Sequence, residues 1–507
     1  MPDMMELNVK EPNGKIDISD SPEITVGDIL DDLGVWQLKR LVLVFFICLP
    51  GCTHVFAMIF ATVSADFWCE SSGKSNATIN QCVEGCAKYE FDREEFQDSI
   101  IMQYGLVCER QYLETVAKLC LFGGYAVGTF VAGMISDHFG RKTAITISCQ
   151  LLFCSGIIVT IMPNMAGFTV LWFIVGIAAI SVYTVAFVWC SEMVGRNWKV
   201  TISLSLSLAF PIAKLMVTLA AYFIRDYKIL YQGFSSLHLF TPMLMILIPE
   251  SPRWLLSRRT PESQAEACQI LAEVAKSKGQ HFDLALFKDE SASSDGKPAE
   301  KVDHFSLILT NAKLRTRGFV MLYCWLTTSF VVYSVNLNMK SLTGSLFLNL
   351  TLAAFLSIPG RLLGYLLMTK FSIRKFPFVG SLLIGAVGCG LCPLLDNRVP
   401  WQSTTLSALV LLSATSLSCT FSIIWLYTAE LYPTGIRNFG VGLSSFMARI
   451  GGAGSTLVVY LAAIHTSVPF FVFSGMCFVA AVLALLLPET GHHPLPTSIK
   501  EIEDRDK

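Results

Sequence analysis

The chain has 507 residues, of which 53% are hydrophobic and only 15% are charged, and its formal net charge is -1. Soluble domains carry charge on about a quarter of their residues, so this composition argues against a soluble enzyme and favours a protein whose solvent is lipid. The near-neutral balance gives no reason to expect a nucleic-acid partner. Charges gather in a few segments, and between them remain stretches of about 20 apolar residues, the length of a membrane-spanning helix.

The N-terminal segment, residues 1–40, is acidic and precedes the first long apolar run. No small-residue cleavage site follows that run, which argues against a cleaved signal peptide. Residues 25–40 have the pattern of a short amphipathic helix, with Ile29, Leu30 and Trp36 on one face. We expect this helix to lie on the inner membrane surface.

Twelve apolar stretches are candidate transmembrane helices, so the sequence predicts an all-α membrane protein. They cover residues 41–63, 113–135, 143–161, 168–190, 200–223, 229–248, 319–336, 345–369, 376–394, 406–427, 439–463 and 469–487. An even number of spans puts both termini on one side. Short loops rich in Lys and Arg share that side, so the positive-inside rule makes it cytoplasmic and predicts a multi-pass plasma-membrane protein.

The loop at residues 64–112 is then expected to face the outside of the cell. It holds Cys69, Cys82, Cys86 and Cys108, together with a glycosylation sequon at Asn76. Four cysteines in an oxidising compartment predict two disulfides, for which three pairings are possible. We also expect Asn76 to carry a glycan.

An internal repeat relates the two halves of the chain. Glu192 follows span four as Glu430 follows span ten, and a Pro-Glu pair follows both span six, at Pro249, and span twelve, at Pro488. The offsets are 238 residues (430 minus 192) and 239 residues (488 minus 249). Two landmarks at one spacing predict a duplicated six-helix unit, an architecture in which two halves rock about a central site.

The repeat and the spans together set the expected domain organisation. Two pseudo-symmetric six-helix bundles occupy residues 41–248 and 319–487. A cytoplasmic linker at 249–318 joins them and contains a Ser-, Asp- and Gly-rich patch at 291–296, a composition typical of flexible linkers. A cytoplasmic tail follows at 488–507.

The loop between spans two and three, residues 133–142, reads GMISDHFGRK and resembles the signature loop of the major facilitator superfamily. Its glycines permit a tight turn, while Asp137 and Arg141 can form charged hydrogen bonds that hold one conformation and break in another. A solvated charged turn would explain the charges but not the glycine spacing. The corresponding loop at 369–375 lacks the acid and the glycine, so we expect a one-sided latch. With residues after spans four and ten, the expected latch comprises Asp137, Arg141, Glu192, Arg196, Glu430 and Arg437.

The whole chain resembles solute carrier family 22, the organic ion transporters. The resemblance rests on the large cysteine loop and on residues 249–254 (PESPRW), 425–434 (WLYTAELYPT) and 487–490 (LPET). It implies a twelve-helix major facilitator fold and secondary transport by alternating access. Two positions of the first half depart from the family pattern: Trp172 replaces the usual Arg that opens span four, and the Tyr-Lys pair at 227–228 replaces the usual Trp-Arg.

Three basic residues are predicted to lie inside the membrane. Arg449 is ten residues into span eleven, about 15 Å from the inner edge of a hydrocarbon core about 30 Å thick. Arg361 has a similar depth in span eight, and Lys214 lies nearer the outside in span five. Each cation costs about 2.5–3.5 kcal/mol on insertion scales, yet the spans offer no matching carboxylate. The cations could cap carbonyls at kinks or line water; the sharper hypothesis is that the missing counter-ion is the substrate.

The family resemblance supports an anionic substrate. The anion-carrying members look basic at the positions matching Arg361 and Arg449. The cation carriers, in contrast, look acidic at the position matching Arg449 and usually also at the position matching Ser357. Carnitine-type carriers share the basic residue at Arg449 but lack the one at Arg361. Tyr333, Phe421 and Trp425 match positions associated with substrate contact, although aromatic pairs at helical spacing often only pack.

The sequence thus predicts a secondary active transporter that exchanges a small organic anion for a counter-anion, with Arg449, Arg361, Lys214, Tyr333, Phe421 and Trp425 binding substrate. A carrier of carnitine-like zwitterions or organic cations is the alternative. A channel or a non-transporting receptor is a more distant one, because neither needs duplicated halves with latch loops. No catalytic, metal or cofactor motif is recognised, so no enzyme activity and no cofactor are expected. The lipid bilayer is the only macroscopic partner that the sequence implies.

Overall fold

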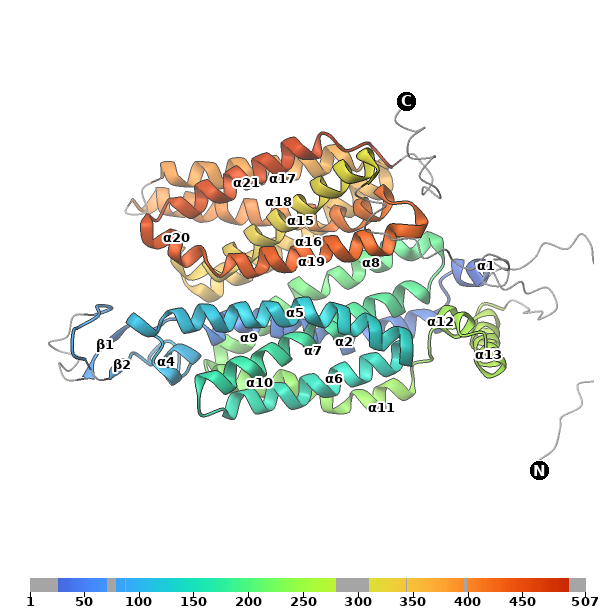
Figure 1. Cartoon of the computed structure of the whole chain (residues 1–507), viewed down its shortest axis with the longest axis horizontal. Helices are drawn as coiled ribbons and strands as arrows, with labels where there is room; N and C mark the ends of the chain where they lie inside the picture. Colours follow the sequence, from blue (N-terminus) through green and yellow to red (C-terminus); the bar gives the residue numbers. More distant parts are fainter. Residues whose placement is uncertain are drawn as a thin grey trace, which may run out of the picture.

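The computed structural model of the chain describes residues 26–70, 79–86, 88–279, 310–342, 344–395 and 399–491. Asn76, the linker patch at 291–296 and the tail from residue 492 onward lie outside these ranges. The described helices form two bundles that lie side by side, one from each half of the sequence (Figure 1).

The first bundle contains the six spans expected from the sequence. They are α2 (Val35–Ala61), α5 (Tyr112–Phe139), α6 (Arg141–Ile158, followed by the 3-10 turn Val159–Ile161), α7 (Met165–Glu192), the pair α8 (Lys199–Ser207) and α9 (Ala209–Ile224), and the series α10 (Tyr227–Ser236), 3-10 turn Leu237–Phe240 and α11 (Thr241–Ile246). The break between α8 and α9 precedes Pro211, and α11 contains Pro at its start. Proline lacks a backbone N–H and interrupts the helical ladder, so these spans are segmented.

The second bundle repeats this plan. Its helices are α15 (Ala312–Leu337), α16 (Leu346–Lys370), α17 (Lys375–Leu391, followed by the turn Cys392–Leu394), α18 (Pro400–Leu431), the pair α19 (Thr434–Ser455) and α20 (Val458–Ile464), and α21 (Val468–Ala484). A 3-10 turn, Met339–Ser341, follows α15. Side chains cap several starts: Asn164 accepts from Gly167 N in α7, and Ser345 accepts from Leu348 N in α16. The span boundaries predicted from hydropathy mostly fall inside longer helices.

Nine helices of the described chain are long and apolar enough to cross a membrane, and the bent pair in span eleven makes a tenth. Span twelve falls short by length, because α21 has only 17 residues, and span six is divided into α10, a 3-10 turn and α11. Large apolar side chains such as Phe223, Ile246 and Leu394 lie exposed on the bundle surface. In water such a surface would be costly, whereas in a bilayer it faces acyl chains.

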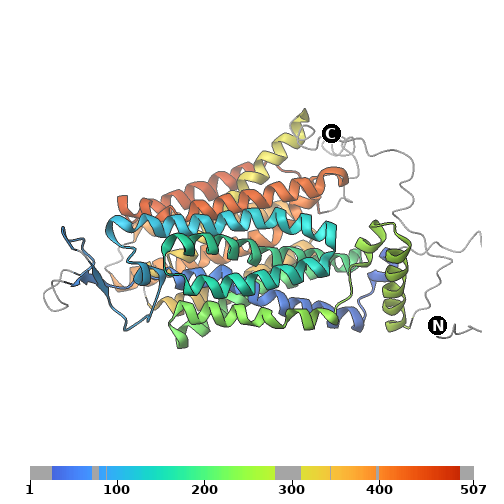
Figure 2. The ribbon, with the colours of Figure 1, turned by 60° about the horizontal axis from the view of Figure 1, so that its bottom comes forward.

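Opposite ends of the molecule carry different structures. One end, here called the disulfide end, holds β1 (Phe67–Cys69), β2 (Tyr89–Phe91), α4 (Ile100–Tyr104) and the turn Cys108–Arg110. The other, the α13 end, holds α1 (Val26–Asp31), α12 (Pro252–Ser257) and α13 (Pro261–Ser277). Figures 1 and 2 show the spans running from one end to the other.

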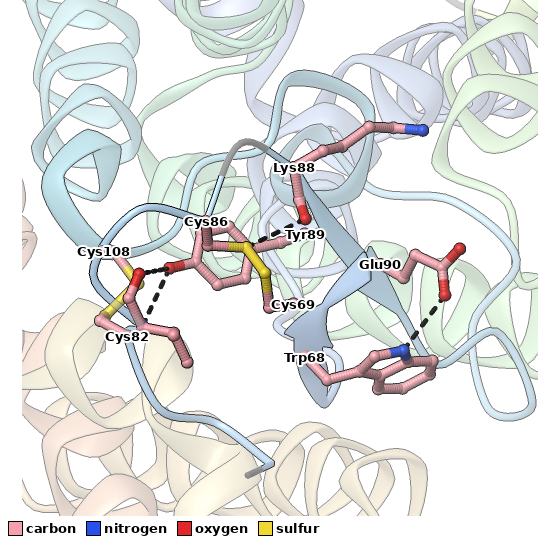
Figure 3. Close-up of a disulfide and its surroundings, with 9 residues drawn as sticks. Trp68, Cys69, Cys82, Cys86, Lys88, Tyr89, Glu90 and Cys108 are labelled. Atoms are coloured by element: carbon pink, nitrogen blue, oxygen red, sulfur yellow. Dashed lines mark hydrogen bonds between the residues drawn. A yellow bond between two sulfur atoms is a disulfide. The ribbon is translucent and has the colours of Figure 1, made fainter. Parts of the chain in front are cut away.

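Two disulfides secure the disulfide end. Cys69 pairs with Cys86 and Cys82 pairs with Cys108, one of the three pairings that the sequence left open. Strands β1 and β2 are antiparallel, with Cys69 opposite Tyr89, so the first disulfide lies beside the ladder (Figure 3). Trp68 donates from Nε1 to Glu90 Oε2 at 3.1 Å on the same ladder. A short sheet and two cross-links give shape to a loop that has little core of its own.

The α13 end corrects the prediction for residues 25–40. The expected amphipathic helix is two helices, because α1 ends at Asp31 and α2 begins at Val35 and continues across the membrane. The apolar face of α1 packs on α12 and α13, where Leu30 and Leu271 are fully buried, rather than lying on a membrane surface. The apolar face of α1 packs against protein because α13 offers a matching apolar stripe close by.

Candidate functional site

A cavity of about 100 Å³ lies between the two bundles. Its lining includes all six residues predicted from the sequence: Arg449, Arg361, Lys214, Tyr333, Phe421 and Trp425. The lining also contains residues that the sequence analysis did not select, among them Phe56, Tyr183, Phe210, Trp325, Ser329 and Asn336. Both halves therefore build the cavity, and no carboxylate of the described chain lines it.

Arg361 on α16 and Arg449 on α19 bring two guanidinium groups to the cavity from the second half. The Nε atom of each is buried without a hydrogen-bond partner. Neither arginine takes part in an ion pair within the described ranges. Because a charged donor in a low-dielectric site is costly when left unsatisfied, both groups suit a ligand with acceptor oxygens.

Close helix crossings place these two arginines. A side chain at Gly451, two residues after Arg449, would put its Cβ 2.3 Å from the Leu326 carbonyl oxygen of α15. At Gly360, next to Arg361, a Cβ would lie 2.5 Å from the Thr415 carbonyl oxygen of α18. Only glycine permits such approach of two helix backbones, so α19 and α16 can bring long arginine side chains into a small space.

Lys214 differs from the arginines because it has a partner. It is 4% exposed on α9, and its Nζ donates to Asn336 Oδ1 on α15, across the two halves. The amide of Asn336 also donates from Nδ2 to the Val332 carbonyl oxygen at 2.7 Å, which directs Oδ1 toward the lysine. Lys214 also lies 5.9 Å from the centre of the Phe56 ring. This tie joins the halves on one side of the cavity.

We expect Asn336→Ala to loosen this tie. A hydrogen bond to a charged group contributes about 1.5–3 kcal/mol, so its loss should raise the rate at which a cysteine introduced at Ser329 reacts with a membrane-impermeant maleimide by about tenfold. Asn336→Asp is the matched control, since a carboxylate strengthens the tie and should slow labelling. The parent chain without the new cysteine gives the background. Labelling that changes in the same direction in both variants would contradict the role of the tie.

Aromatic side chains form the apolar walls. Trp325 donates from Nε1 to Thr428 Oγ1 at 2.9 Å, which fixes its ring against Trp425, with centroids 4.6 Å apart. Trp425 also reaches Phe187 of the first half, at 5.9 Å. Phe421 lies 6.4 Å from Trp325. The predicted pair on α18 thus both packs and lines the cavity.

Contacts between the halves are present on both sides of the cavity. Toward the disulfide end, Phe347 of the second half stacks on Phe60 and Phe96, with centroids 5.9 and 5.6 Å apart. Toward the α13 end, the Thr201 and Tyr365 hydroxyls are hydrogen-bonded at 2.9 Å. The two halves are therefore in contact on both sides of the cavity.

The predicted latch residues of the first half meet at the α13 end. The Arg141 guanidinium donates to both oxygens of Glu192, at 3.0 and 2.9 Å, and to Asp137 Oδ1 at 3.0 Å. Gly140, with φ of +97°, makes the turn that starts α6 at this point. The Arg141–Glu192 pair is largely buried, whereas the Asp137 side chain is 78% exposed. The pair with Glu192 is therefore the stronger part of this cluster.

Glu250 is a member of this cluster that sequence reasoning missed. Its carboxylate accepts from the backbone N–H groups of Arg141, Lys142 and Ser251, at 2.8–3.2 Å. Burial raises the pKa of the Glu250 carboxyl above its ordinary value, although these N–H groups and the Arg141 charge act in the opposite direction. The Pro-Glu repeat, which places Glu489 at the matching position, was the signal that could have identified it.

The second half has an equivalent cluster, so the expectation that the charged contacts are confined to the first half is wrong. Arg374 donates from Nε and Nη2 to Glu430, at 3.1–3.3 Å, and Glu489 accepts from the N–H groups of Arg374 and Lys375, at 2.8 and 3.0 Å. Thr490 adds a hydrogen bond to Glu430 at 2.6 Å. The loop at 369–375 lacks the acid, but its arginine suffices, because the glutamates come from other segments.

The remaining two predicted latch residues are placed differently. Arg437 donates from Nε to the Tyr432 carbonyl oxygen at 3.3 Å, near the end of α18. The side chain of Arg196 lies outside the described part of the structure. Arg374, which was not among the predicted latch residues, is the arginine that pairs with Glu430.

The two departures from the family pattern have local partners. Trp172 donates from Nε1 to the Tyr231 hydroxyl at 2.9 Å inside the first bundle. Lys228 pairs with Asp98 at 2.7 Å and so ties α10 to the segment that precedes α4. The substituted positions are therefore structural contacts of the first half rather than part of the cavity.

Similarity to known proteins identifies the family. The profile of the Major Facilitator Superfamily matches residues 115–456. The human protein Organic cation/carnitine transporter 2 is 30% identical over 423 residues, which cover 83% of this chain and 74% of that protein. Solute carrier family 22 member 15 of Xenopus tropicalis is 31% identical over 414 residues, or 80% of this chain and 75% of the relative.

This chain is a member of solute carrier family 22 in the major facilitator superfamily. The structure of the proton:xylose symporter XylE, bound to 6-bromo-6-deoxy-D-glucose, shares the fold with a TM-score of 0.64 at 17% identity, covering 92% of this chain and 99% of that one. The predicted fold class is thereby confirmed, as is the expectation of a multi-pass membrane transporter rather than an enzyme. Membership in a transporter family also argues against the channel and receptor alternatives.

Proposed function

We propose that this transporter carries small organic anions across the plasma membrane by alternating access. The observation that supports this proposal is the charge of the cavity, where Lys214, Arg361 and Arg449 meet no carboxylate within the described chain. Each isolated cation at this depth is costly, and a substrate carboxylate or sulfonate would supply the acceptor oxygens. Guanidinium groups bind such oxygens bidentately.

The cavity has one region for the anionic group of a substrate and another for its apolar body. Arg361 and Arg449 face the anionic group, while aromatic rings from both halves, such as Phe210 and Trp425, enclose an apolar body. Ser357, at the position where cation carriers of the family are usually acidic, is neutral here and accepts a hydrogen bond from Ser418 at 3.1 Å. A small apolar or aromatic monoanion fits this distribution of charge.

The orientation that we propose places the disulfide end outside the cell and the α13 end in the cytoplasm. Disulfides persist in oxidising compartments, and the basic loops at the α13 end satisfy the positive-inside rule. Both termini are then cytoplasmic.

A carrier of carnitine-like zwitterions or organic cations is the second candidate, because relatives named Organic cation/carnitine transporter 2 and Solute carrier family 22 member 3 are similar to this chain. A zwitterion would give its carboxylate to the arginines and its ammonium group to the aromatic walls. A simple cation has no partner for the three positive groups and would be repelled.

An uptake panel separates these candidates. We expect cells that express the protein to take up radiolabelled carboxylates or sulfate esters at least about tenfold faster than tetraalkylammonium cations, after normalisation to surface protein. Zwitterions should compete only if their carboxylate is free, so the methyl ester of each zwitterion is the matched control. Preferred uptake of cations, or of the esters, would replace the anion proposal.

We also propose exchange as the transport mode. A potential of about 100 mV, inside negative, opposes entry of each negative charge by about 2.3 kcal/mol, so an anion uniporter would run outward. Proteoliposomes loaded with an unlabelled dicarboxylate should take up labelled anion several-fold faster than empty ones. Equal rates with every internal anion tested would contradict exchange and favour uniport or coupling to another ion.

A further inference from the structure

Helix α5 of the first half and α19 of the second lie side by side along the boundary between the two bundles (Figure 1). Phe122 of α5 is 1% exposed, and its ring reaches Gly452 of α19 across this boundary. A Cβ atom added at Gly452 would lie 2.5 Å from Phe122 Cε1. Glycine therefore leaves room for the ring, which occupies a notch in the surface of the other bundle.

Two aromatic neighbours fix the direction of the Phe122 ring in this notch. Tyr125, three residues further along α5, meets it edge to face, with ring centroids 5.4 Å apart and an interplanar angle of 90°. Tyr333 of α15 meets it in the same manner, at 5.0 Å and 84°. One neighbour belongs to each half, so Phe122 joins a ring of its own bundle to a ring of the opposite bundle.

The neighbour in the opposite bundle belongs to the candidate site. Tyr333 lines the transport cavity together with Arg449, and its hydroxyl interacts with the Arg449 side chain. Gly452 follows Arg449 by three residues on α19, so the notch and the base of the arginine side chain lie within one helical turn. Phe122 itself does not line the cavity, so it can act on a bound anion only through its neighbours.

A second aromatic contact across the same boundary lacks this connection. Phe130, eight residues after Phe122 on α5, lies 5.7 Å from Phe446 of α19, about 12 Å further toward the α13 end. Neither of these two rings lines the cavity. Comparing the two contacts therefore separates a general role in holding the bundles together from a role in the site.

We propose that Phe122 is a positioning residue for anion binding, which holds Tyr333 against Arg449 while the two bundles have the orientation of this structure. A tyrosine hydroxyl beside a guanidinium group can accept one of its N–H groups and so direct the others toward a carboxylate. Rocking of the bundles would withdraw the Phe122 ring from the notch, release Tyr333 and lower the affinity for the anion. This role rests on the proposed function, anion transport, and links anion affinity to bundle orientation.

The role is tested by binding of radiolabelled benzoate, a single aromatic ring with a carboxylate, to the purified full-length transporter in nanodiscs. We expect Phe122→Ala to raise the Kd about three- to tenfold, because the edge-to-face contact with Tyr333 is lost. Phe130→Ala, the matched control, should leave the Kd within about twofold. Gly452→Ala should raise the Kd as Phe122→Ala does, by displacing the ring, but should have no further effect in the Phe122→Ala background.

A double-mutant cycle with Arg449 distinguishes positioning from loosened packing. In the Arg449→Lys background, where the planar fork is absent, Phe122→Ala should change the Kd by less than about twofold. Effects of the two substitutions that multiply, as for independent sites, would show that Phe122 does not act through Arg449. A rise of the same size in Phe130→Ala would assign the effect to the whole interface. Thermal melting curves show which variants are folded, and Gly452→Ala tests the same contact if Phe122→Ala does not fold.

Failure of the proposed function gives a different result from failure of this role. Wild-type protein that does not bind benzoate would contradict the proposed site for small aromatic anions, and the role of Phe122 would fall with it. Benzoate binding that is present in wild type and equal in folded Phe122→Ala would refute the role of Phe122 alone and leave anion transport in place.

Discussion

Uptake of organic anions should fall by about 10- to 150-fold when Arg449 is replaced by alanine, because the substrate loses a charged hydrogen bond of about 1.5–3 kcal/mol. Arg449 has a buried Nε atom without a partner and lies beside Tyr333 in the cavity. Arg449→Lys keeps the charge but not the planar fork and should retain part of the activity. Concentration-dependent uptake, normalised to surface protein, gives the ratio of maximal rate to KM.

Two further variants make this prediction sharper. Arg449→Asp reverses the local charge, so it should abolish anion uptake and can admit cations. Arg361→Ala should weaken discrimination between an anion and its neutral amide analogue. Arg110→Ala, which removes an exposed arginine at the disulfide end, is the control for general effects of lost charge. Anion uptake at the wild-type rate in the double variant Arg361→Ala/Arg449→Ala would show that both arginines are structural and would leave the substrate class open.

Glu192→Gln and Glu430→Gln should each reduce the turnover rate by about five- to tenfold while KM changes less than about twofold. These carboxylates hold Arg141 and Arg374 in buried pairs at the α13 end, and none of these four residues lines the cavity. A latch biases the conformations of the transporter rather than contacting substrate. Counterflow in proteoliposomes measures turnover, and competition with unlabelled anion measures affinity.

The graded effect of neighbouring acids provides the control for this experiment. Asp137→Asn should have a smaller effect than Glu192→Gln, since the Asp137 side chain is mostly exposed and exposed pairs contribute about 0–1 kcal/mol. Glu266→Gln, on the exposed face of α13, should behave as wild type. If Glu430→Gln alone were silent, the second-half cluster would have no role in turnover, and the one-sided latch would be restored. A loss of affinity equal to the loss of rate would place these acids in substrate binding.

Hydropathy and the repeat were sufficient to predict the twelve spans and two halves, because lipid imposes long apolar stretches whatever the tertiary contacts. The same patterns could not place helix ends. Residues 35–40 belong to α2 although they include charged side chains, since the helix extends beyond the membrane to reach α13. The pattern of residues 25–40 predicts one helix, because a hydrophobic stripe does not reveal where the backbone changes direction.

The sequence could identify a cavity residue only where that residue type is unusual at its depth in the membrane. Arg361 and Arg449 could be selected because a charge in a span is rare. Asn336 and Ser329 could not, since polar side chains of ordinary type occur in many spans and only the packing of α9 against the second half makes them neighbours. Phe56 and Phe210 could not be selected from the sequence either, because one phenylalanine in an apolar helix resembles any other.

The attachment of the α13 end to one bundle has a practical consequence for following motion. Gln37 donates to the Met193 carbonyl oxygen at 2.8 Å, and the Gly195 N–H donates to the Leu30 carbonyl oxygen at 2.9 Å. Together with the apolar packing of α1 on α13, these bonds make α13 a fixed extension of the first bundle. With one spin label on the exposed face of α13 and a second at the turn between α16 and α17, the distance between the two labels would therefore report the rocking angle between the bundles. No label in the membrane would be needed.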